Sequence, residues 1–249
     1  MSARVGVLVG AWRAARMLAH IAHGVYLVQL RWSGFEPSRR TQLVGWWSRK
    51  LLRLLGVRLE APGDQTPTPR LITANHVSWL DIAAIHAVMP EARFVSKADI
   101  ATWPIVGALA TAVGTLYIER ASKRDALRVV HKTAEALARG ETVAVFPEGT
   151  TGGGYPLLPL HGNLLQAAIS THTALQPVVL RWHQPGTPYS EAAQYIGQMT
   201  LFESLWRILT ARDLAVEVRS LPAMPTEGLD RRHLAEALAA RMNEALPRP

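Results

Sequence analysis

A histidine and an aspartate five residues apart are the residues of this 249-residue chain best suited to catalysis. His76 follows the apolar run Leu71–Ala74, and Asp81 opens an apolar stretch with helical character. With His76 in the strand-to-helix turn and Asp81 in the first helical turn, the carboxylate can fold back onto the imidazole. An aspartate that accepts from Nδ1–H leaves Nε2 free to remove a proton from a substrate hydroxyl.

The same residues also fit a purely structural interpretation. Ser78 and Asp81 have the spacing of an acidic variant of a capping box, in which both side chains bind amides at the start of a helix. His76 would then be a packed turn residue. The spacing alone leaves catalysis and helix capping both open.

A second candidate site is the loop that follows the apolar run Val143–Phe146, where Pro-Glu-Gly-Thr-Thr precedes three glycines at 152–154. Proline ends the strand, and Gly149 permits a positive φ. Backbone amides and threonine hydroxyls in such a loop can donate hydrogen bonds to a bound anion. The alternative is a surface turn with one solvated glutamate, Glu148. Neither a Walker A loop nor a dinucleotide-binding fingerprint occurs.

A third candidate is Arg120, which ends the expected strand Thr115–Glu119. Its planar guanidinium could bind a phosphate through two parallel N–H···O hydrogen bonds. A surface arginine paired with Glu119 or Asp125 is the alternative. The serine-hydrolase motif Gly-x-Ser-x-Gly and the zinc motif His-Glu-x-x-His are both absent from the sequence.

Composition narrows the class of protein. Hydrophobic residues make up 49% of the chain, which excludes a long disordered polymer. Cysteine is absent, so a disulfide framework, a cysteine-ligated metal and a thiol nucleophile are excluded. The net charge of +8 favours anionic partners. No recognised nucleic-acid module is present, so nucleic acid is not an expected partner.

From residue 56 onward, β-rich runs alternate with helical stretches, which predicts one α/β domain over 56–249. Its sheet should be largely parallel or mixed and flanked by helices. Strands are expected at Val57–Ala61, Arg70–Ala74, Arg93–Ser96, Thr115–Glu119, Thr142–Phe146, Pro177–Trp182 and Ala215–Ser220. Helices are expected at Leu80–Val88, Ile105–Val113, Lys123–Ala138, Leu160–Thr171, Leu201–Ala211 and Arg231–Ala245.

Residues 1–55 form a separate, membrane-associating helical segment in this interpretation. Val5–Leu30 is mostly apolar, yet its four basic or histidine residues lie on a single helical face (Arg13, Arg16, His20 and His23). The amphipathic stretch Ser38–Leu55 mixes tryptophans and arginines with leucines, as at a headgroup boundary. Two ordinary amphipathic helices packed on a core are the alternative, and a tilted spanning helix over 5–30 is a further one.

In this order and spacing, the segments resemble the glycerolipid acyltransferases, whose best-known members are the 1-acyl-sn-glycerol-3-phosphate acyltransferases. The resemblance covers residues 55–220, and the segment Phe94–Lys97 also resembles the family. Four family blocks match Asn75–Asp81, with the hallmark His-x-x-x-x-Asp, Gly114–Arg120, Phe146–Thr150 and Pro177–Val179.

The resemblance implies a mixed α/β enzyme on the cytoplasmic membrane with its active site facing the cytoplasm. The acyl donor would be a thioester of coenzyme A or acyl carrier protein, and the acceptor would be a lysolipid. The resemblance implies neither a cofactor nor a metal for the enzyme. In phospholipid biosynthesis, acylation of lysophosphatidic acid gives phosphatidic acid. By this resemblance His76 is the base and Asp81 orients it. The implied substrate-binding residues are Asn75, Lys97, Arg120, Glu148, Gly149 and Thr150.

One departure concerns the acceptor. The third family block normally ends in an arginine, and Thr151 stands there in this chain. Its absence removes a phosphate contact and weakens the case for lysophosphatidic acid, so a lyso-ornithine-lipid acceptor is the close alternative. Two other classes stay open: a basic membrane-binding protein without enzymatic activity, and a hydrolase that uses the same dyad on thioesters.

Overall fold

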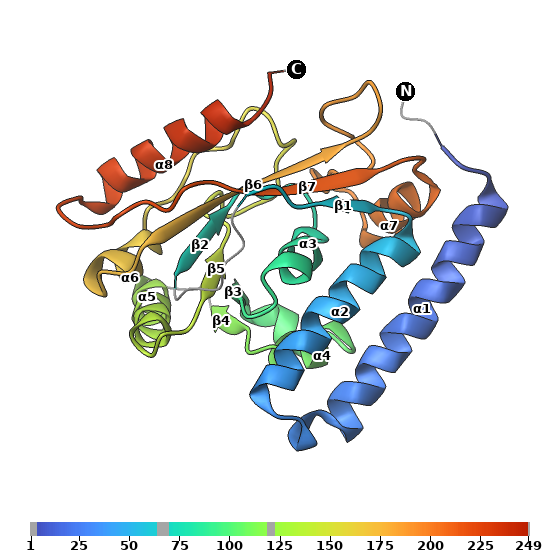
Figure 1. The fold of residues 1–249 in the computed structure, drawn as a ribbon, viewed down its shortest axis with the longest axis horizontal. Helices are drawn as coiled ribbons and strands as arrows, with labels where there is room; N and C mark the ends of the chain where they lie inside the picture. The colour runs from blue at the N-terminus through green and yellow to red at the C-terminus, as the bar shows by residue number, and fades with distance from the viewer. Residues whose placement is uncertain (1–3, 64–69, 119–122, 249) are drawn as a thin grey trace.

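One seven-stranded sheet forms the centre of the computed structural model, which describes residues 4–63, 70–118 and 123–248 (Figure 1). The strand order is β1-β7-β6-β2-β5-β3-β4, and only β6 and β7 pair antiparallel. The predicted α/β fold and all seven predicted strands are confirmed. The strands are β1 Arg58–Glu60, β2 Leu71–Ala74, β3 Arg93–Lys97, β4 Leu116–Ile118, β5 Val143–Val145, β6 Leu175–His183 and β7 Ala215–Ser220.

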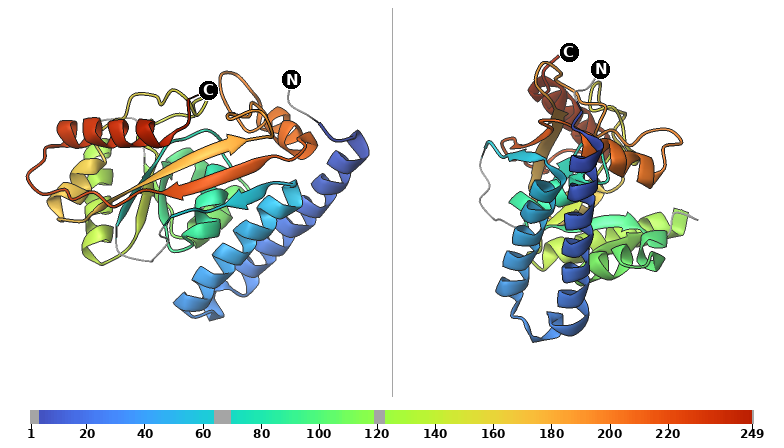
Figure 2. Two further views of the ribbon diagram at one scale, coloured as in Figure 1. Left: turned by 45° about the horizontal axis from the view of Figure 1, so that its top comes forward. Right: turned by 90° about the vertical axis from the view of Figure 1, so that its right-hand side faces the viewer.

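Helices cover both faces of the sheet (Figure 2). Successive residues of β2 point to opposite faces, so Ile72 packs with α2, α3 and α7 while Leu71 packs with α5, α6 and α8. The helices are α1 Val7–Leu30, α2 Pro37–Leu55, α3 Asp81–Val88, α4 Val106–Ala112, α5 Lys123–Ala138, α6 Leu165–Ser170, α7 Leu201–Thr210 and α8 Arg231–Ala245. Two short 3-10 helices, η1 Trp32–Gly34 and η2 Ala98–Thr102, were not predicted.

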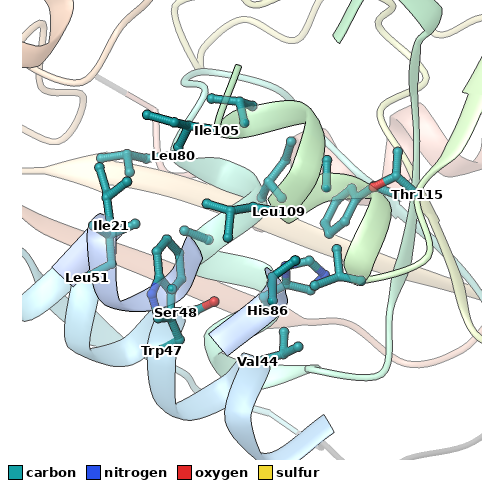
Figure 3. A pocket seen from close by; sticks show the side chains of 18 of the residues that line it. Ile21, Val44, Trp47, Ser48, Leu51, Leu80, His86, Ile105, Leu109 and Thr115 are labelled. Atoms are coloured by element: carbon teal, nitrogen blue, oxygen red, sulfur yellow. The ribbon is translucent and has the colours of Figure 1, made fainter. Parts of the chain in front are cut away.

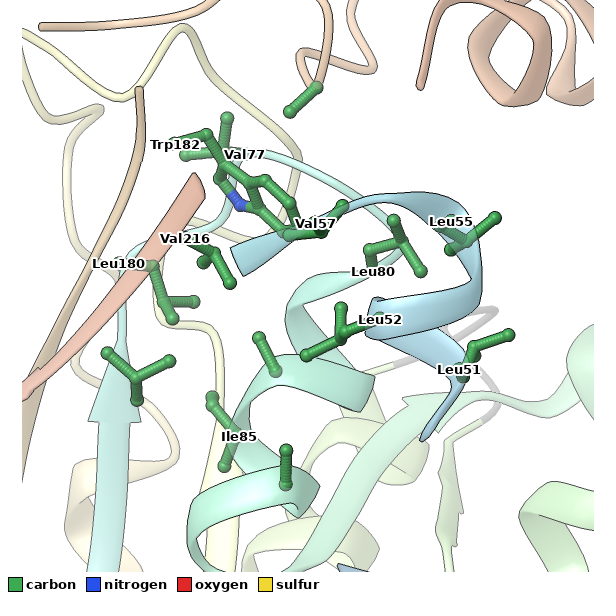
Figure 4. Close-up of a cluster of buried hydrophobic side chains, with 14 of the residues drawn as sticks. Leu51, Leu52, Leu55, Val57, Val77, Leu80, Ile85, Leu180, Trp182 and Val216 are labelled. Atoms are coloured by element: carbon green, nitrogen blue, oxygen red, sulfur yellow. The ribbon is translucent and has the colours of Figure 1, made fainter. Parts of the chain in front are cut away.

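The first two helices form an antiparallel hairpin that joins the main core. Leu52 and Leu55 of α2 are almost completely buried and pack in one cluster with Ile85 of α3 and Val216 of β7 (Figure 4). Residue 55 therefore ends a helix without marking the edge of the packed core. Among the described helices, none is both long and apolar enough to cross a membrane.

A reciprocal contact locks α1 against α2. His20 Nε2 donates to the Trp47 carbonyl at 3.0 Å, and the Trp47 indole N–H donates to the His20 carbonyl at 3.3 Å. The two rings stack with their centroids 4.9 Å apart. A Cβ at Gly24 would lie 2.6 Å from the indole nitrogen, so only glycine permits this approach. The hairpin is therefore a specific packed unit.

Helix α6 is shorter than predicted. It begins at Leu165, whereas the pattern indicated Leu160. The backbone N–H of His161 donates to the Pro147 carbonyl at 2.8 Å, and that of Leu158 donates to the Glu148 carboxylate at 3.0 Å. Because these long-range bonds use amides of the segment, residues 160–164 are irregular or in a turn where the apolar pattern suggested a helix.

The topology gathers the predicted site residues at one edge of the sheet. Strands β2, β3 and β5 run parallel. His76 follows β2, Lys97 ends β3, and Glu148 follows β5. The carboxyl ends of parallel strands meet at one edge, which is the usual position of an α/β active site.

Candidate active site

His76 and Asp81 form the contact that their spacing suggested. The imidazole Nδ1 lies 2.8 Å from Asp81 Oδ2. Because a carboxylate oxygen accepts, Nδ1 carries the proton and Nε2 is left as the basic nitrogen. The His76 side chain is 19% exposed, whereas Asp81 is fully buried. The predicted geometry is confirmed, and it gives a histidine an open, proton-accepting face.

Asp81 is held by more donors than the imidazole alone. Its Oδ2 also accepts from the backbone N–H groups of Val77 at 2.7 Å and Ser78 at 2.9 Å. Its Oδ1 accepts the indole N–H of Trp182 at 2.7 Å. The carboxylate thus stabilises the turn before α3 and also orients the imidazole, so the capping and catalytic interpretations describe the same interaction.

Phe146 fixes the plane of the imidazole. Its ring stacks on the ring of His76 with centroids 4.0 Å apart and an interplanar angle of 11°. Phe94 in turn stacks behind Phe146 at 5.6 Å. With one face packed and one nitrogen bound to Asp81, the orientation of the His76 ring is set on two sides.

Glu148 ties the loop after β5 to the turn after β2. Its Oε1 accepts the backbone N–H of His76 at 2.7 Å, and its Oε2 accepts the N–H of Leu158 at 3.0 Å. Burial raises the pKa of the Glu148 carboxyl, although both N–H groups act in the opposite direction. Glu148 was predicted to bind the acceptor. Because both of its oxygens hold backbone amides, we expect it to act by positioning His76.

Further bonds close the loop around the dyad. The Gly152 N–H donates to the His76 carbonyl at 2.7 Å, and the Tyr195 N–H donates to the Val77 carbonyl at 3.0 Å. The hydroxyl of Thr151 donates to the Tyr195 carbonyl. Thr151, which replaces the family arginine, therefore fastens the segment around Tyr195.

The remaining predicted site residues lie in different surroundings. Asn75 is buried, and its amide exchanges two hydrogen bonds with the backbone of Leu180, at 2.9 and 2.7 Å. It joins β2 to β6. Gly149 has a φ of 71° and continues the turn after β5, while Thr150 and Lys97 are exposed. Arg120 lies outside the described residues.

Two residues that support the dyad were missed by sequence reasoning. Trp182 is the largest fully buried side chain, and its N–H reaches Asp81 from 101 residues away in the sequence. The sequence signal was a tryptophan at the end of an apolar strand, since a buried indole N–H needs an acceptor. The stacking role of Phe146 had no comparable signal in the local pattern.

An apolar cavity of about 280 Å³ lies between the first four helices (Figure 3), and His76 and Asp81 are not among the described residues that line it. Its wall includes Trp79 and Leu80, which directly precede Asp81, and continues along α1, α2, α3 and α4. Ile105 also lines it, in a strained backbone conformation with φ 69°. The lining is mostly hydrocarbon, which suits an acyl chain.

His86 brings a titratable group into this wall. It is 5% exposed, and its Nε2 donates to the Ala92 carbonyl at 2.9 Å. Burial lowers the pKa of His86 to about 4, against the opposing effect of that hydrogen bond. The imidazole is therefore neutral at physiological pH.

Comparison with known proteins agrees with this geometry. The Acyltransferase family model matches residues 58–181. A lyso-ornithine lipid O-acyltransferase from Pseudomonas aeruginosa is 36% identical over 230 residues, which cover 90% of this chain and 88% of that protein. A 1-acyl-sn-glycerol-3-phosphate acyltransferase from Neisseria meningitidis is 35% identical over 184 residues, 73% of this chain and 71% of that protein.

A solved structure supports the fold independently. The crystal structure of the 1-acyl-sn-glycerophosphate acyltransferase from Thermotoga maritima matches with a TM-score of 0.73 at 16% identity, covering 96% of this chain and 95% of that one. The fold, the family model and the relatives define an acyltransferase. The chain belongs to the glycerolipid acyltransferase family.

Replacing Trp182 tests how much the dyad depends on its buried partner. In Trp182→Phe, Asp81 Oδ1 loses its donor, so we expect kcat to fall about tenfold and stability to fall by about 1.5–3 kcal/mol. The pH-rate profile of acyl transfer should shift as the imidazole loses orientation. Trp206→Phe, on α7, is the matched control. Equal kcat and an unchanged profile in both variants would show that Trp182 only fills the core.

The lowered pKa of His86 predicts a pH-dependent stability. The unfolded chain binds this proton near pH 6.5 and the folded chain only near pH 4. The contribution of the buried, neutral imidazole to the stability of the fold is therefore complete above pH 6.5 and is lost as the pH falls toward 4. The shift corresponds to about 3 kcal/mol. Denaturant titrations between pH 4 and 7 should show a shallower dependence in His86→Leu than in wild type. The exposed His131→Gln should keep the wild-type slope, and a wild-type slope in His86→Leu would contradict the burial argument.

Proposed function

We propose that this enzyme transfers an acyl group from a thioester to the free hydroxyl of a lysolipid. The observation that carries the proposal is the bond between His76 Nδ1 and the buried Asp81 carboxylate, which leaves Nε2 as an oriented base. The family supports the reaction class, because its relatives named above include acyltransferases for two lysolipids.

The reaction follows from this arrangement without a covalent enzyme intermediate. His76 Nε2 takes the proton of the acceptor hydroxyl as its oxygen attacks the thioester carbonyl carbon. Asp81 stabilises the imidazolium that forms. Collapse of the tetrahedral intermediate breaks the C–S bond, and the imidazolium returns its proton to the leaving thiolate. The products are an ester and a free thiol, and the histidine ends in its starting state.

The apolar cavity supports a place for an acyl chain. Its wall starts at Trp79 and Leu80, beside the dyad, and is hydrocarbon over most of its surface. A chain seated there would have its carbonyl end near His76. The donor is then a long-chain thioester of coenzyme A or acyl carrier protein, used as a co-substrate.

Thr151 favours an acceptor without a phosphomonoester. The hydroxyl of Thr151 is used by the Tyr195 carbonyl, and the position carries no charge for a phosphate. The relative from Pseudomonas aeruginosa, which is 36% identical and covers 90% of this chain, acts on lyso-ornithine lipid by its name. We therefore place lyso-ornithine lipid first and lysophosphatidic acid second as acceptor.

The surface of α1 supports attachment to the cytoplasmic membrane face. Arg13 turns inward and donates to the carbonyls of Leu209 and Ala211, both at 2.9 Å, and His20 is buried. Leu8 and Trp12 instead are 87% and 63% exposed. A helix that exposes apolar side chains beside basic ones, as Arg16 lies over Trp12 here, suits an interfacial position in a bilayer.

Loss of the base tests the reaction, and an acceptor panel tests the substrate. His76→Ala should lower acyl transfer by about 10²–10⁴ because general-base catalysis is removed. The exposed His131→Ala serves as control.

With one labelled acyl-CoA, the wild type should acylate lyso-ornithine lipid faster than lysophosphatidic acid. Wild-type turnover by His76→Ala would refute the mechanism, and the reverse acceptor preference would refute the Thr151 argument.

Exposed apolar residues of α1 provide the test for membrane attachment. Leu8→Gln combined with Trp12→Gln should weaken partition to anionic vesicles by roughly 10²- to 10⁴-fold, since the two side chains together contribute about 3–6 kcal/mol when they are buried. Leu127→Gln changes a leucine that is 70% exposed on α5, at the opposite side of the fold (Figure 1), and should bind as wild type. Vesicle co-sedimentation measures both, and equal binding by all three proteins would contradict the attachment surface.

A further inference from the structure

The apolar cavity contains a small polar region whose groups the proposed reaction does not use. Among the residues that line the cavity, four carry a hydroxyl or an imidazole, and the others are aliphatic, aromatic or glycine. The four are Ser48, His86, Ser96 and Thr115. Two of them, Ser48 and His86, are more than nine-tenths buried.

The hydrogen bonding of His86 defines what it can accept. The Ala92 carbonyl can only accept, so His86 Nε2 carries the proton and Nδ1 is a bare acceptor. Among the described residues, nothing donates to Nδ1. An acceptor enclosed by hydrocarbon without a donor is unfavourable, and a ligand that donates there would satisfy it.

Ser48 lies on the adjacent helix at a matching level. Arg49 Nη1 donates to the Ala87 carbonyl at 2.5 Å, and a Cβ at Gly45 would lie 3.2 Å from Pro90. These contacts place Ser48 opposite the last turn of α3. In the described part of the chain its hydroxyl has no hydrogen-bond partner, although a helical serine often binds the carbonyl four residues back.

The two polar groups lie away from the dyad along the cavity. Helix α3 starts beside the dyad at Asp81 and reaches His86 five residues later, a rise of about 7.5 Å. Figure 3 shows Leu80 and Leu51 toward one end of the cavity and His86 and Val44 toward the other. Because α2 runs antiparallel to α3 here, the step from Leu51 to Val44 on α2 leads away from the dyad, as does the step from Asp81 to His86 on α3.

We propose that His86 and Ser48 recognise a hydroxyl group on the acyl chain that occupies the cavity. The chain hydroxyl donates to His86 Nδ1 and accepts from the Ser48 hydroxyl. The rise along α3 sets this hydroxyl back from the thioester, toward the middle of the chain. The inference rests on the proposed function, since it takes the cavity as the acyl site.

The polar pair discriminates because an unsubstituted chain satisfies neither group. Seating methylenes against Nδ1 and the serine hydroxyl removes both from water without a hydrogen bond. A site built to bind a hydroxyl rejects the analogue that lacks it more strongly than an apolar site rejects an added hydroxyl. The enzyme should therefore favour hydroxyacyl donors over plain donors of equal length.

The experiment compares three acyl-CoA donors of one chain length: unsubstituted, hydroxylated beside the carbonyl, and hydroxylated in mid-chain. We expect wild type to show at least a tenfold higher kcat/KM for the mid-chain hydroxyacyl donor than for the unsubstituted one. His86→Leu and Ser48→Ala should each lower this ratio toward one by slowing the hydroxyacyl reaction. Val44→Ala, which alters the same end of the cavity without touching polarity, should keep the ratio.

A binding measurement separates this inference from the reaction. The corresponding free fatty acids are titrated by tryptophan fluorescence, because Trp47 and Trp79 line the cavity. Tighter binding of the mid-chain hydroxy acid, lost in Ser48→Ala, supports the polar site even if transfer to a lysolipid fails. Equal affinity for plain and hydroxylated acids in wild type overturns it. A changed chain-length optimum in His86→Leu with an unchanged hydroxyl preference also overturns it.

Discussion

The carboxylate of Asp81 is a fully buried charge, and the structure around it is organised to satisfy that charge. Four donors reach it: the imidazole of His76, two turn amides, and the indole N–H of Trp182. A buried ion that loses its partners is strongly destabilising. The turn after β2 and the end of β6 must therefore stay together, and Asn75 secures the same pair of strands through Leu180. The geometry of the His76–Asp81 pair and the register of the sheet thus depend on the same contacts.

The α1–α2 hairpin serves the site from the other side. Its inner surface supplies Trp47 and Leu51 to the apolar cavity, and its outer surface presents Leu8 and Trp12. The hydrogen bonds of the inward-facing Arg13 and His20 fix the rotation of α1 about its own axis. This rotation decides which side chains of α1 face the core and which face outward. A lipid that leaves the bilayer beside α1 would meet the cavity wall formed by the same hairpin, which gives this proposal a short route from membrane to dyad.

Local sequence patterns were sufficient to predict the strands and the contact between His76 and Asp81. Alternating apolar runs predicted every strand, and the spacing of His76 and Asp81 predicted their contact, because both depend on neighbours within a few residues. The rest depends on residues far apart in sequence. Trp182 reaches Asp81 from β6, and Glu148 binds the amide of His76 across 72 residues. The late start of α6 has the same origin, since Leu158 and His161 are bound to the loop after β5.

In the proposed function, one loop residue, Thr151, bears on which acceptor is bound and leaves the His76–Asp81 dyad unchanged. An arginine at position 151 would bring a charge to the edge of the dyad, whereas Thr151 donates to the Tyr195 carbonyl and tightens the loop. The dyad, Phe146 and Glu148 need none of that charge, since their contacts are with one another, with Trp182 and with the backbone. Under the proposed function, proton transfer is therefore separable from headgroup choice, because the residues assigned to the two tasks share no side-chain hydrogen bond.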